Sequence, residues 1–149
     1  MSLISVIHGP NLNLLGQREP EIYGQESLDQ IDAALRRNAS DLGIDIESFQ
    51  SNHEGAIVDR IQTCPGRVQG LIINAAAYTH TSVAIRDAIC ALGPELPCVE
   101  VHLSVPGARE NFRKINLLED VVAGRIEGFG ALSYLLALSA LSTIVASRG

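Results

Sequence analysis

The sequence predicts an α/β fold built on a parallel sheet, and two observations lead to this prediction. Apolar runs of strand length alternate along the chain with segments of helical periodicity. Glycine and proline interrupt the alternation at Gly43, Pro65-Gly66 and Gly93-Pro94, where three of the helical segments end. Strands that alternate with helices form parallel sheets that carry helices on both faces.

Five apolar runs have the composition of strands. The first contains one serine, Ser5, and the third is a buried run that ends at the polar Asn74. The predicted strands are Leu3–Ile7, Ile44–Phe49, Val68–Ile73, Pro97–Leu103 and Val121–Ile126.

The first predicted helix has the clearest boundaries. Ser27 and Gln30 have the spacing of a capping box, and Gly43 supplies the stop. Its apolar stripe consists of Leu28, Ile31, Leu35 and Leu42. The other predicted helices are Glu54–Thr63, a helix from Thr81 or Ser82 to Leu92, Arg109–Leu118 and an apolar C-terminal helix. Five strand–helix units fit a flavodoxin-like three-layer sandwich with a five-stranded parallel sheet, and residues 1–149 are expected to form one domain.

Composition narrows the classes of partner and compartment. The net charge of -6 leaves no basic face for phosphate backbones, so we expect no nucleic acid partner. The three cysteines lack metal-type spacing and are expected to be reduced thiols in a cytoplasmic protein; they are Cys64, Cys90 and Cys98. The N-terminus has no signal-peptide pattern. The apolar run 131–146 is shorter than the roughly 20 residues of a membrane span, so we expect a buried or interface helix and no membrane partner.

Polar side chains gather where three predicted strands end. The first strand is followed by the segment 8–24, HGPNLNLLGQREPEIYG, which contains two asparagines, an arginine, a tyrosine and three glycines. Asn74 and His80 follow the third strand, and the fourth contains Glu100 and His102. Ligands of open α/β sheets bind outside the carboxyl ends of the strands. We therefore predict a ligand site at this edge.

Glu100 and His102 are the strongest chemical candidates. They are two residues apart on a strand, so their side chains point to one face. A carboxylate beside an imidazole favours the charged ring and fixes its orientation, so that His102 can deliver a proton to a leaving group. A structural ion pair at a strand end is the alternative.

Other candidate pairs each have a functional and a structural interpretation. Arg18 could favour the phenolate of Tyr23, whose unperturbed pKa of about 10 is too high for a base, or the tyrosine ring could anchor a lid. Asn11 and its neighbour Asn13 could serve a turn instead of a site.

The remaining polar candidates stay equally open. Arg109 and Arg113 would share a helix face, where they could bind an anionic substrate or remain solvated. His80 with Asp87 could be a site pair, or His80 could be a cap or core residue. His8 and His53 could both be structural.

Several familiar motifs are absent from the sequence. No P-loop follows the first strand, and Gly128-Phe129-Gly130 is too weak for a dinucleotide fingerprint. No zinc-type histidine or cysteine pair is present, so we expect no dedicated metal site.

Four separated motifs resemble the type II 3-dehydroquinate dehydratase family. They are segment 8–24, QSNHEG at 50–55, INAAAYTHTSVAIRDA at 73–88 and EVHLS at 100–104, and GFGALSYLLAL at 128–138 is also similar to the family's C-terminal segment. The resemblance implies a flavodoxin-like enzyme that removes water from 3-dehydroquinate through an enolate, without metal or organic cofactor. It also implies a homododecamer built from trimers.

The resemblance also implies a role for each matching residue. Tyr23 would be the general base, kept ionised by Arg18, and His102, oriented by Glu100, would protonate the departing hydroxyl. Asn11 would hold a water against the enolate oxygen. The substrate-binding residues would be Asn74, Leu103 and Ser104 for the carboxylate, His80 and Arg113 for ring hydroxyls, and Asp87 from a neighbouring subunit.

One segment departs from the family pattern. After Ser104 the family reads Asn, an apolar residue, His, Ala and Arg, whereas this chain has Val105-Pro106-Gly107-Ala108-Arg109. The departure concerns the rigidity of this loop and the placement of Arg109. We still expect an active enzyme.

Two other functions are the alternatives. A non-catalytic flavodoxin-like module could bind a nucleotide or flavin, although the chain has no Trp and only six Phe and Tyr residues for ring walls. A hydrolase could use Ser82 or Ser104 as its nucleophile, although no Gly-x-Ser-x-Gly elbow is present.

Overall fold

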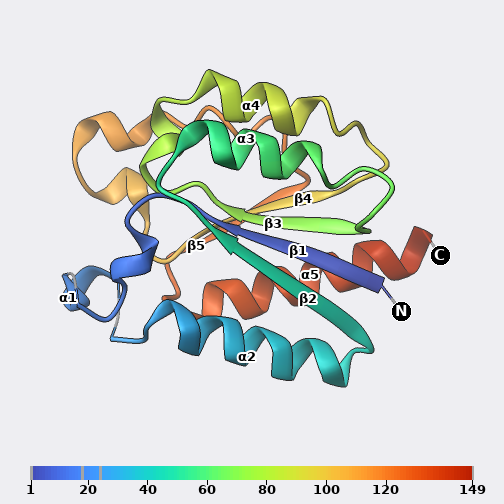
Figure 1. Cartoon of the computed structure of the whole chain (residues 1–149). Coiled ribbons are helices and arrows are strands. Elements are labelled where there is room, and N and C mark those ends of the chain that lie inside the picture. The colour runs from blue at the N-terminus through green and yellow to red at the C-terminus, as the bar shows by residue number, and fades with distance from the viewer. Residues whose placement is uncertain (1, 18, 24, 149) are drawn as a thin grey trace.

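Figure 1 shows a twisted parallel sheet between two layers of helices in the computed structural model, which describes residues 2–17, 19–23 and 25–148. The strand order is β2-β1-β3-β4-β5, and every neighbouring pair is parallel. The strands are β1 Ser2–His8, β2 Ile44–Gln50, β3 Gly70–Asn74, β4 Cys98–His102 and β5 Gly124–Glu127. The predicted flavodoxin-like three-layer architecture is confirmed.

Each face of the sheet is covered by two helices (Figure 1). One layer contains α2, Leu28–Asp41, and α5, Leu132–Arg148, and the other contains α3, Glu54–Gln62, and α4, Val83–Cys90. The apolar residues of the strands separate into two buried clusters, one facing each layer. Burial of this apolar surface is the main favourable contribution to folding, and it fixes the position of the strand ends.

The predicted boundaries of α2 hold at its start. Ser27 Oγ accepts a hydrogen bond from Gln30 N (3.2 Å), and Gln30 Oε1 accepts one from Ser27 N (2.8 Å), which completes the capping box. The prediction that Leu42 belongs to the apolar stripe is wrong, because the helix ends at Asp41 and the Leu42 side chain is exposed. Ala39 is buried in its place, four residues after Leu35.

The predicted helix Arg109–Leu118 is also wrong. The chain forms two 3₁₀ turns instead, η3 at Pro106–Ala108 and η4 at Asn111–Lys114. The Asn116 carboxamide oxygen accepts hydrogen bonds from Leu118 N and Glu119 N, and such local side-chain bonds compete with helical backbone bonds. The next turn, closed by Val121 N donating to Leu118 O, delays the start of β5 to Gly124.

The C-terminal helix α5 is partly buried, as predicted, with Tyr134, Ala137, Leu138 and Leu141 against the sheet. Within the described ranges, no helix combines the length and apolar character that a membrane crossing requires.

Three strands end together at one edge of the sheet, at the left of Figure 1. His8 at the end of β1 pairs in register with Asn74 at the end of β3, and β4 ends at His102. The connections that leave this edge place short helical turns directly after the strands, before any long helix: η1 Leu12–Leu14, α1 Pro20–Tyr23, η2 Ala76–His80, η3 and η4. Short turns keep these polar residues close to the strand ends.

Candidate active site

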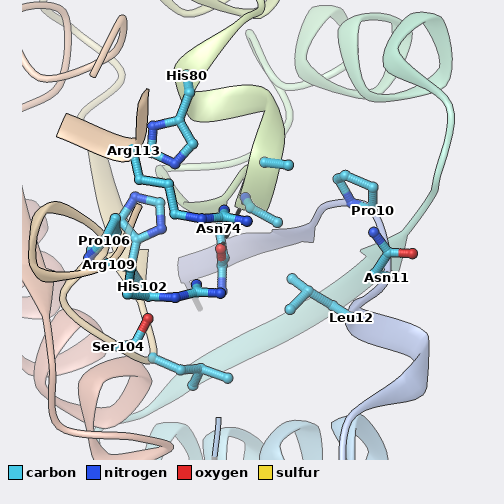
Figure 2. Close-up of a pocket in the computed structure, with 13 residues that line it drawn as sticks. Pro10, Asn11, Leu12, Asn74, His80, His102, Ser104, Pro106, Arg109 and Arg113 are labelled. Atoms are coloured by element: carbon cyan, nitrogen blue, oxygen red, sulfur yellow. Dashed lines mark hydrogen bonds between the residues drawn. The ribbon is translucent and has the colours of Figure 1, made fainter. Parts of the chain in front are cut away.

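A cavity of about 140 Å³ lies at the carboxyl ends of β1, β3 and β4. Figure 2 shows Pro10, Asn11 and Leu12 on one side of it, opposite a wall that contains His102 and Ser104. Its lining residues are Pro10, Asn11, Leu12, Asn74, Ala76, Ala77, His80, His102, Leu103, Ser104, Pro106, Arg109 and Arg113. The cavity is at the edge that the sequence predicts.

The fourth strand supplies a buried histidine–carboxylate pair. Glu100 is fully buried and His102 is 5% exposed, and His102 Nε2 lies 2.5 Å from Glu100 Oε2. The same carboxylate oxygen accepts a hydrogen bond from Asn116 Nδ2 (2.8 Å). Because Nε2 is engaged by Glu100, Nδ1 is the ring nitrogen of His102 that remains available to a ligand in the cavity.

The third strand supplies a carboxamide that is held on both sides. Asn74 Oδ1 accepts a hydrogen bond from Ala76 N (3.1 Å), and Asn74 Nδ2 donates one to the hydroxyl of Tyr134 (3.0 Å). The backbone of Gly9 packs against this turn, and a Cβ at Gly9 would lie 2.6 Å from Ala75 O. Glycine is therefore required there for β1 and β3 to end side by side.

The loop after β1 is fixed by Gln50, the last residue of β2, and by Asn52 just beyond it. Gln50 Nε2 donates to Gly9 O (3.1 Å), and Asn52 Oδ1 accepts from Asn11 N (3.0 Å). Asn11 has a left-handed conformation with φ of 69°, which asparagine tolerates better than most residues. Both interpretations of Asn11 thus apply, because it makes a turn and also lines the cavity.

Cationic and neutral donors line the opposite part of the cavity. Arg113 Nε donates to Glu110 Oε2 (2.7 Å), and this hydrogen bond lowers the pKa of Glu110. His80 Nδ1 lies 2.6 Å from Ile115 O. Arg109 and Arg113 do not share a helix face as predicted, but the two 3₁₀ turns still bring both to the cavity.

The segment that departs from the family pattern, residues 105–109, forms part of this wall. Pro106 is buried in η3 and lines the cavity, as do Leu103 and Ser104 before it. The added Cβ of any residue at Gly128, whose φ is +97°, would lie 2.7 Å from Val105 Cγ2. Val105 therefore lies close to Gly128, at the start of the loop that follows β5, although it is 44% exposed.

Four predicted site residues are not among those that line the cavity, and one of them, Glu100, lies behind the wall and binds His102. Asp87 is exposed on α4. Arg18 lies outside the described residues, and so does the side chain of Tyr23, whose backbone ends α1. These predictions stay predictions.

The two residues left as structural candidates lie outside the cavity lining. His8 is fully buried beneath the site, and His53 is the exposed residue before α3. Ser82, one of the alternative nucleophiles, is buried and caps α4 by accepting a hydrogen bond from Ile85 N (2.9 Å).

Sequence reasoning missed two polar residues that support the site. Asn116 binds Glu100, and nothing in the sequence around it distinguishes it from a loop asparagine. Tyr134 binds Asn74 from within the apolar C-terminal helix, where a single phenol among aliphatic residues was an available signal. Burial raises the pKa of Tyr134, so its hydroxyl is protonated at neutral pH.

The lining itself distinguishes between ligand classes. Among the described residues that line the cavity, none is Phe or Tyr and none is acidic, whereas two arginines and two histidines are present. Such a surface suits a small anionic molecule better than a flavin ring. Over the described ranges, no three His, Cys, Asp or Glu side chains approach closely enough to hold a metal ion.

Comparison with known proteins agrees with this geometry. The family model described as dehydroquinase class II matches residues 2–142. The chain is 59% identical to a 3-dehydroquinate dehydratase of Geotalea daltonii, over 93% of this chain and 94% of that protein. It is 50% identical to one of Ruegeria pomeroyi, over 100% and 99% of the two chains. The crystal structure of a type II dehydroquinase from Butyrivibrio crossotus superposes with a TM-score of 0.91 at 42% identity, covering 94% and 97%.

Proposed function

Because the chain belongs to the class II dehydroquinase family, a family of hydro-lyases, we propose that it removes water from 3-dehydroquinate to give 3-dehydroshikimate. One observation carries the proposal beyond the family: a histidine held by a buried carboxylate lines a small cavity together with donors suited to a hydroxylated acid. Pockets that bind drug-sized ligands measure roughly 300–1,000 Å³, so a cavity of about 140 Å³ suits a single small ring.

The elimination requires a base, an acid and stabilisation of an enolate. A hydrogen next to a ketone becomes acidic only if the resulting enolate is stabilised, so preorganised donors supply much of the rate enhancement. We assign the role of general base to Tyr23, which Arg18 keeps ionised. We assign to Asn11 the role of holding a water molecule against the enolate oxygen. The position of Asn11 on the cavity wall supports the second assignment.

The acid is assigned to His102. The hydrogen bond between Nε2 and Glu100 holds the ring in one orientation, and in the proposed step Nδ1 delivers the proton to the departing hydroxyl. The hydroxyl leaves as water, and the electron pair of the enolate forms the new carbon–carbon double bond. His102 is left neutral, and Glu100 stays ionised.

Substrate binding is assigned to the donors around the acid. Asn74, Ser104 and the backbone of Leu103 would hold the substrate carboxylate, and His80 and Arg113 would hold ring hydroxyls. Asp87 is exposed on α4, which is consistent with its entering the site of a neighbouring subunit. We propose that the chain assembles into trimers and these into a dodecamer, and that it serves the shikimate or quinate pathway in the cytoplasm.

The proposed function is tested by adding 3-dehydroquinate to the purified protein. The conjugated enone of the product absorbs in the ultraviolet, so its appearance reports dehydration directly. We expect full activity after treatment with a chelator, because every assigned role belongs to a side chain, to the backbone or to a water molecule. Absence of the enone signal in wild-type protein would overturn the proposal, and loss of activity with the chelator would overturn the metal-independent mechanism.

The base assignment has a separate test. Tyr23→Phe removes only the phenolic oxygen, and we expect kcat to fall on the order of 100 to 10,000-fold with the fold retained. An unchanged kcat in this variant would show that another group removes the proton.

A further inference from the structure

We propose that Asp32, His8 and Tyr134 form a buried chain of positioning residues that orients the carboxamide of Asn74 for substrate binding. This inference rests on the proposed function, in which Asn74 holds the substrate carboxylate. Tyr134 is fully buried in α5, His8 is fully buried at the end of β1, and Asp32 lies on α2 with a side chain 13% exposed.

The contacts join these residues in one line from the helix layer to the cavity. Asp32 Oδ1 lies 2.9 Å from His8 Nε2, and His8 Nδ1 lies 2.9 Å from the hydroxyl of Tyr134. That hydroxyl lies 3.0 Å from Asn74 Nδ2, and Asn74 lines the cavity. The two rings of His8 and Tyr134 are 5.2 Å apart, so packing also fixes their relative positions.

Only one direction of hydrogen bonding satisfies every group along a chain with a neutral imidazole. The carboxylate of Asp32 can only accept, so His8 carries its proton on Nε2 and presents Nδ1 as an acceptor. Tyr134 then donates its O–H to Nδ1 and accepts from Asn74 with its remaining lone pairs. Asn74 must therefore point its NH₂ group toward Tyr134, and not its carbonyl oxygen.

The hydrogen bond on the other side of the Asn74 carboxamide requires the same orientation of that group. Ala76 N donates to Asn74 Oδ1 at 3.1 Å, which requires the oxygen on that side. Ala76 has a φ of 52°, a left-handed conformation that is unfavourable for a non-glycine residue and that this turn maintains. With both sides fixed, the second N–H of Asn74 remains for a ligand, and a carboxylate is the group that it would bind best.

The ionised state of Asp32, which lies farthest from the cavity, supports this direction of the hydrogen bonds. Burial alone would raise the pKa of Asp32, but the hydrogen bond that its carboxylate accepts from His8, with smaller effects of Ser48 and Arg36, outweighs burial and lowers it. Asp32 is thus ionised at neutral pH. A fixed negative charge at one end orders all the dipoles between it and Asn74.

The test is a double-mutant cycle between Tyr134 and Asn74, measured with 3-dehydroquinate. Tyr134→Phe removes the hydroxyl and keeps the ring, and we expect KM to rise about five- to tenfold with kcat changed less than about threefold, as for loss of one binding hydrogen bond. Asn74→Ala should raise KM further. In the Asn74→Ala background, Tyr134→Phe should have almost no additional effect.

A matched control separates positioning from general destabilisation. Ser133 precedes Tyr134 on α5, is equally buried, and accepts one hydrogen bond from Phe129 N (3.0 Å). Ser133→Ala also loses one buried hydrogen bond but does not contact Asn74, so its KM should stay near the wild-type value. An equal rise in KM for Ser133→Ala and Tyr134→Phe, or an equal effect of Tyr134→Phe in both backgrounds, would overturn the inference.

A measurement without substrate distinguishes this inference from the proposed function. The side-chain amide signals of Asn74, identified in nitrogen-15 NMR spectra by their loss in Asn74→Ala, should move in Tyr134→Phe and stay in place in Ser133→Ala. Should Tyr134→Phe fail to fold, Asp32→Ala at the partly exposed end takes its place, with a smaller shift expected. Unmoved Asn74 signals would overturn the positioning chain, whereas inactive wild-type protein with moved signals would overturn the proposed function alone.

Discussion

The ends of β1 and β4 each carry a buried histidine bound to a carboxylate, but only one of them lines the cavity. At the end of β1, His8 binds Asp32 at 2.9 Å, and at the end of β4, His102 binds Glu100 at 2.5 Å. Each pair also has a neutral polar partner. Tyr134 contacts the His8 ring, and Asn116 contacts the carboxylate of Glu100.

The two pairs differ in the second ring nitrogen. Both nitrogens of His8 have protein partners, so that its ring is fully engaged in structure. His102 uses Nε2 for Glu100 and, among the described residues, has no partner for Nδ1. A histidine–carboxylate pair is therefore a candidate acid only where one nitrogen remains available beside a cavity. The residue types alone do not distinguish the two cases.

The largest expected effect comes from breaking the two pairs in turn. His102→Ala should lower kcat on the order of 100 to 10,000-fold, because the ring acts on the substrate. Both His102→Ala and His8→Ala should lower the free energy of unfolding by about 1–3 kcal/mol, because each leaves buried partners unsatisfied, but His8→Ala should keep most of the wild-type kcat. Steady-state kinetics and thermal unfolding of both variants provide the measurement.

The opposite kinetic results for the two variants would exchange the roles of the two histidines. If His8→Ala lost turnover while fully folded and His102→Ala kept it, the acid would lie at the end of β1.

A smaller effect is expected from substitution of Asn116. It tests how far the neutral partner of Glu100 contributes to the histidine–carboxylate pair at the end of β4. Asn116→Ala removes the hydrogen bond that Glu100 Oε2 accepts beside its contact with His102, and we expect kcat to fall about tenfold as the His102 ring loses its fixed orientation. Asn116→Asp keeps an oxygen for Leu118 N and Glu119 N but places a carboxylate against Glu100, so kcat should fall at least as far.

The pair of variants separates two roles of the same side chain. Recovery of wild-type kcat in Asn116→Asp would show that Asn116 matters only for the turn before β5.

The sequence was informative where local patterns decide structure. Periodicity and the Ser27–Gln30 spacing predicted the five strands, the start of α2 and the edge at which the site lies. Motifs at the strand ends singled out His102, Asn74 and Ser104, and all three line one cavity.

The features that were missed depend on contacts between distant segments. Arg109–Leu118 has helical spacing, but the Asn116 side chain captures the backbone donors that a helix would use. The pairing of His8 with Asp32 and Tyr134 joins residues 24 and 126 positions apart, which periodicity cannot reveal. For the same reason, the sequence left His8 as a structural candidate without a partner.

Ser104 provides a further, smaller test at the β4 end. It lies two residues after His102 and lines the cavity, as a serine nucleophile would. We expect Ser104→Ala to keep kcat within about threefold and to raise KM about threefold, because one hydrogen bond to the substrate is lost. Complete loss of turnover would favour the hydrolase alternative, in which the serine is the reacting group.

The smallest expected effect is a pH dependence at the β1 end. The pKa of Asp32 in the folded protein lies below its usual value of 3.8, so its stabilising contribution is present above pH 3.8 and is lost as the pH falls through the lower folded-state pKa. Asp32→Asn should lower the unfolding temperature at pH 7 by about 2–4 °C, for about 1 kcal/mol. The difference from wild type should shrink below pH 3.8.

A constant difference at all pH values would show that ionisation of Asp32 contributes nothing to the His8 pair, and that only its shape matters.

The position of a bound ring acid tests the central claim most directly. A crystal structure with a hydroxylated cyclohexane carboxylic acid that cannot eliminate water should place the hydroxyl that corresponds to the leaving group within about 3.2 Å of His102 Nδ1. Its carboxylate should lie against Asn74 and Ser104. A ring bound in this cavity with that hydroxyl directed away from His102, or bound elsewhere on the molecule, would contradict the account.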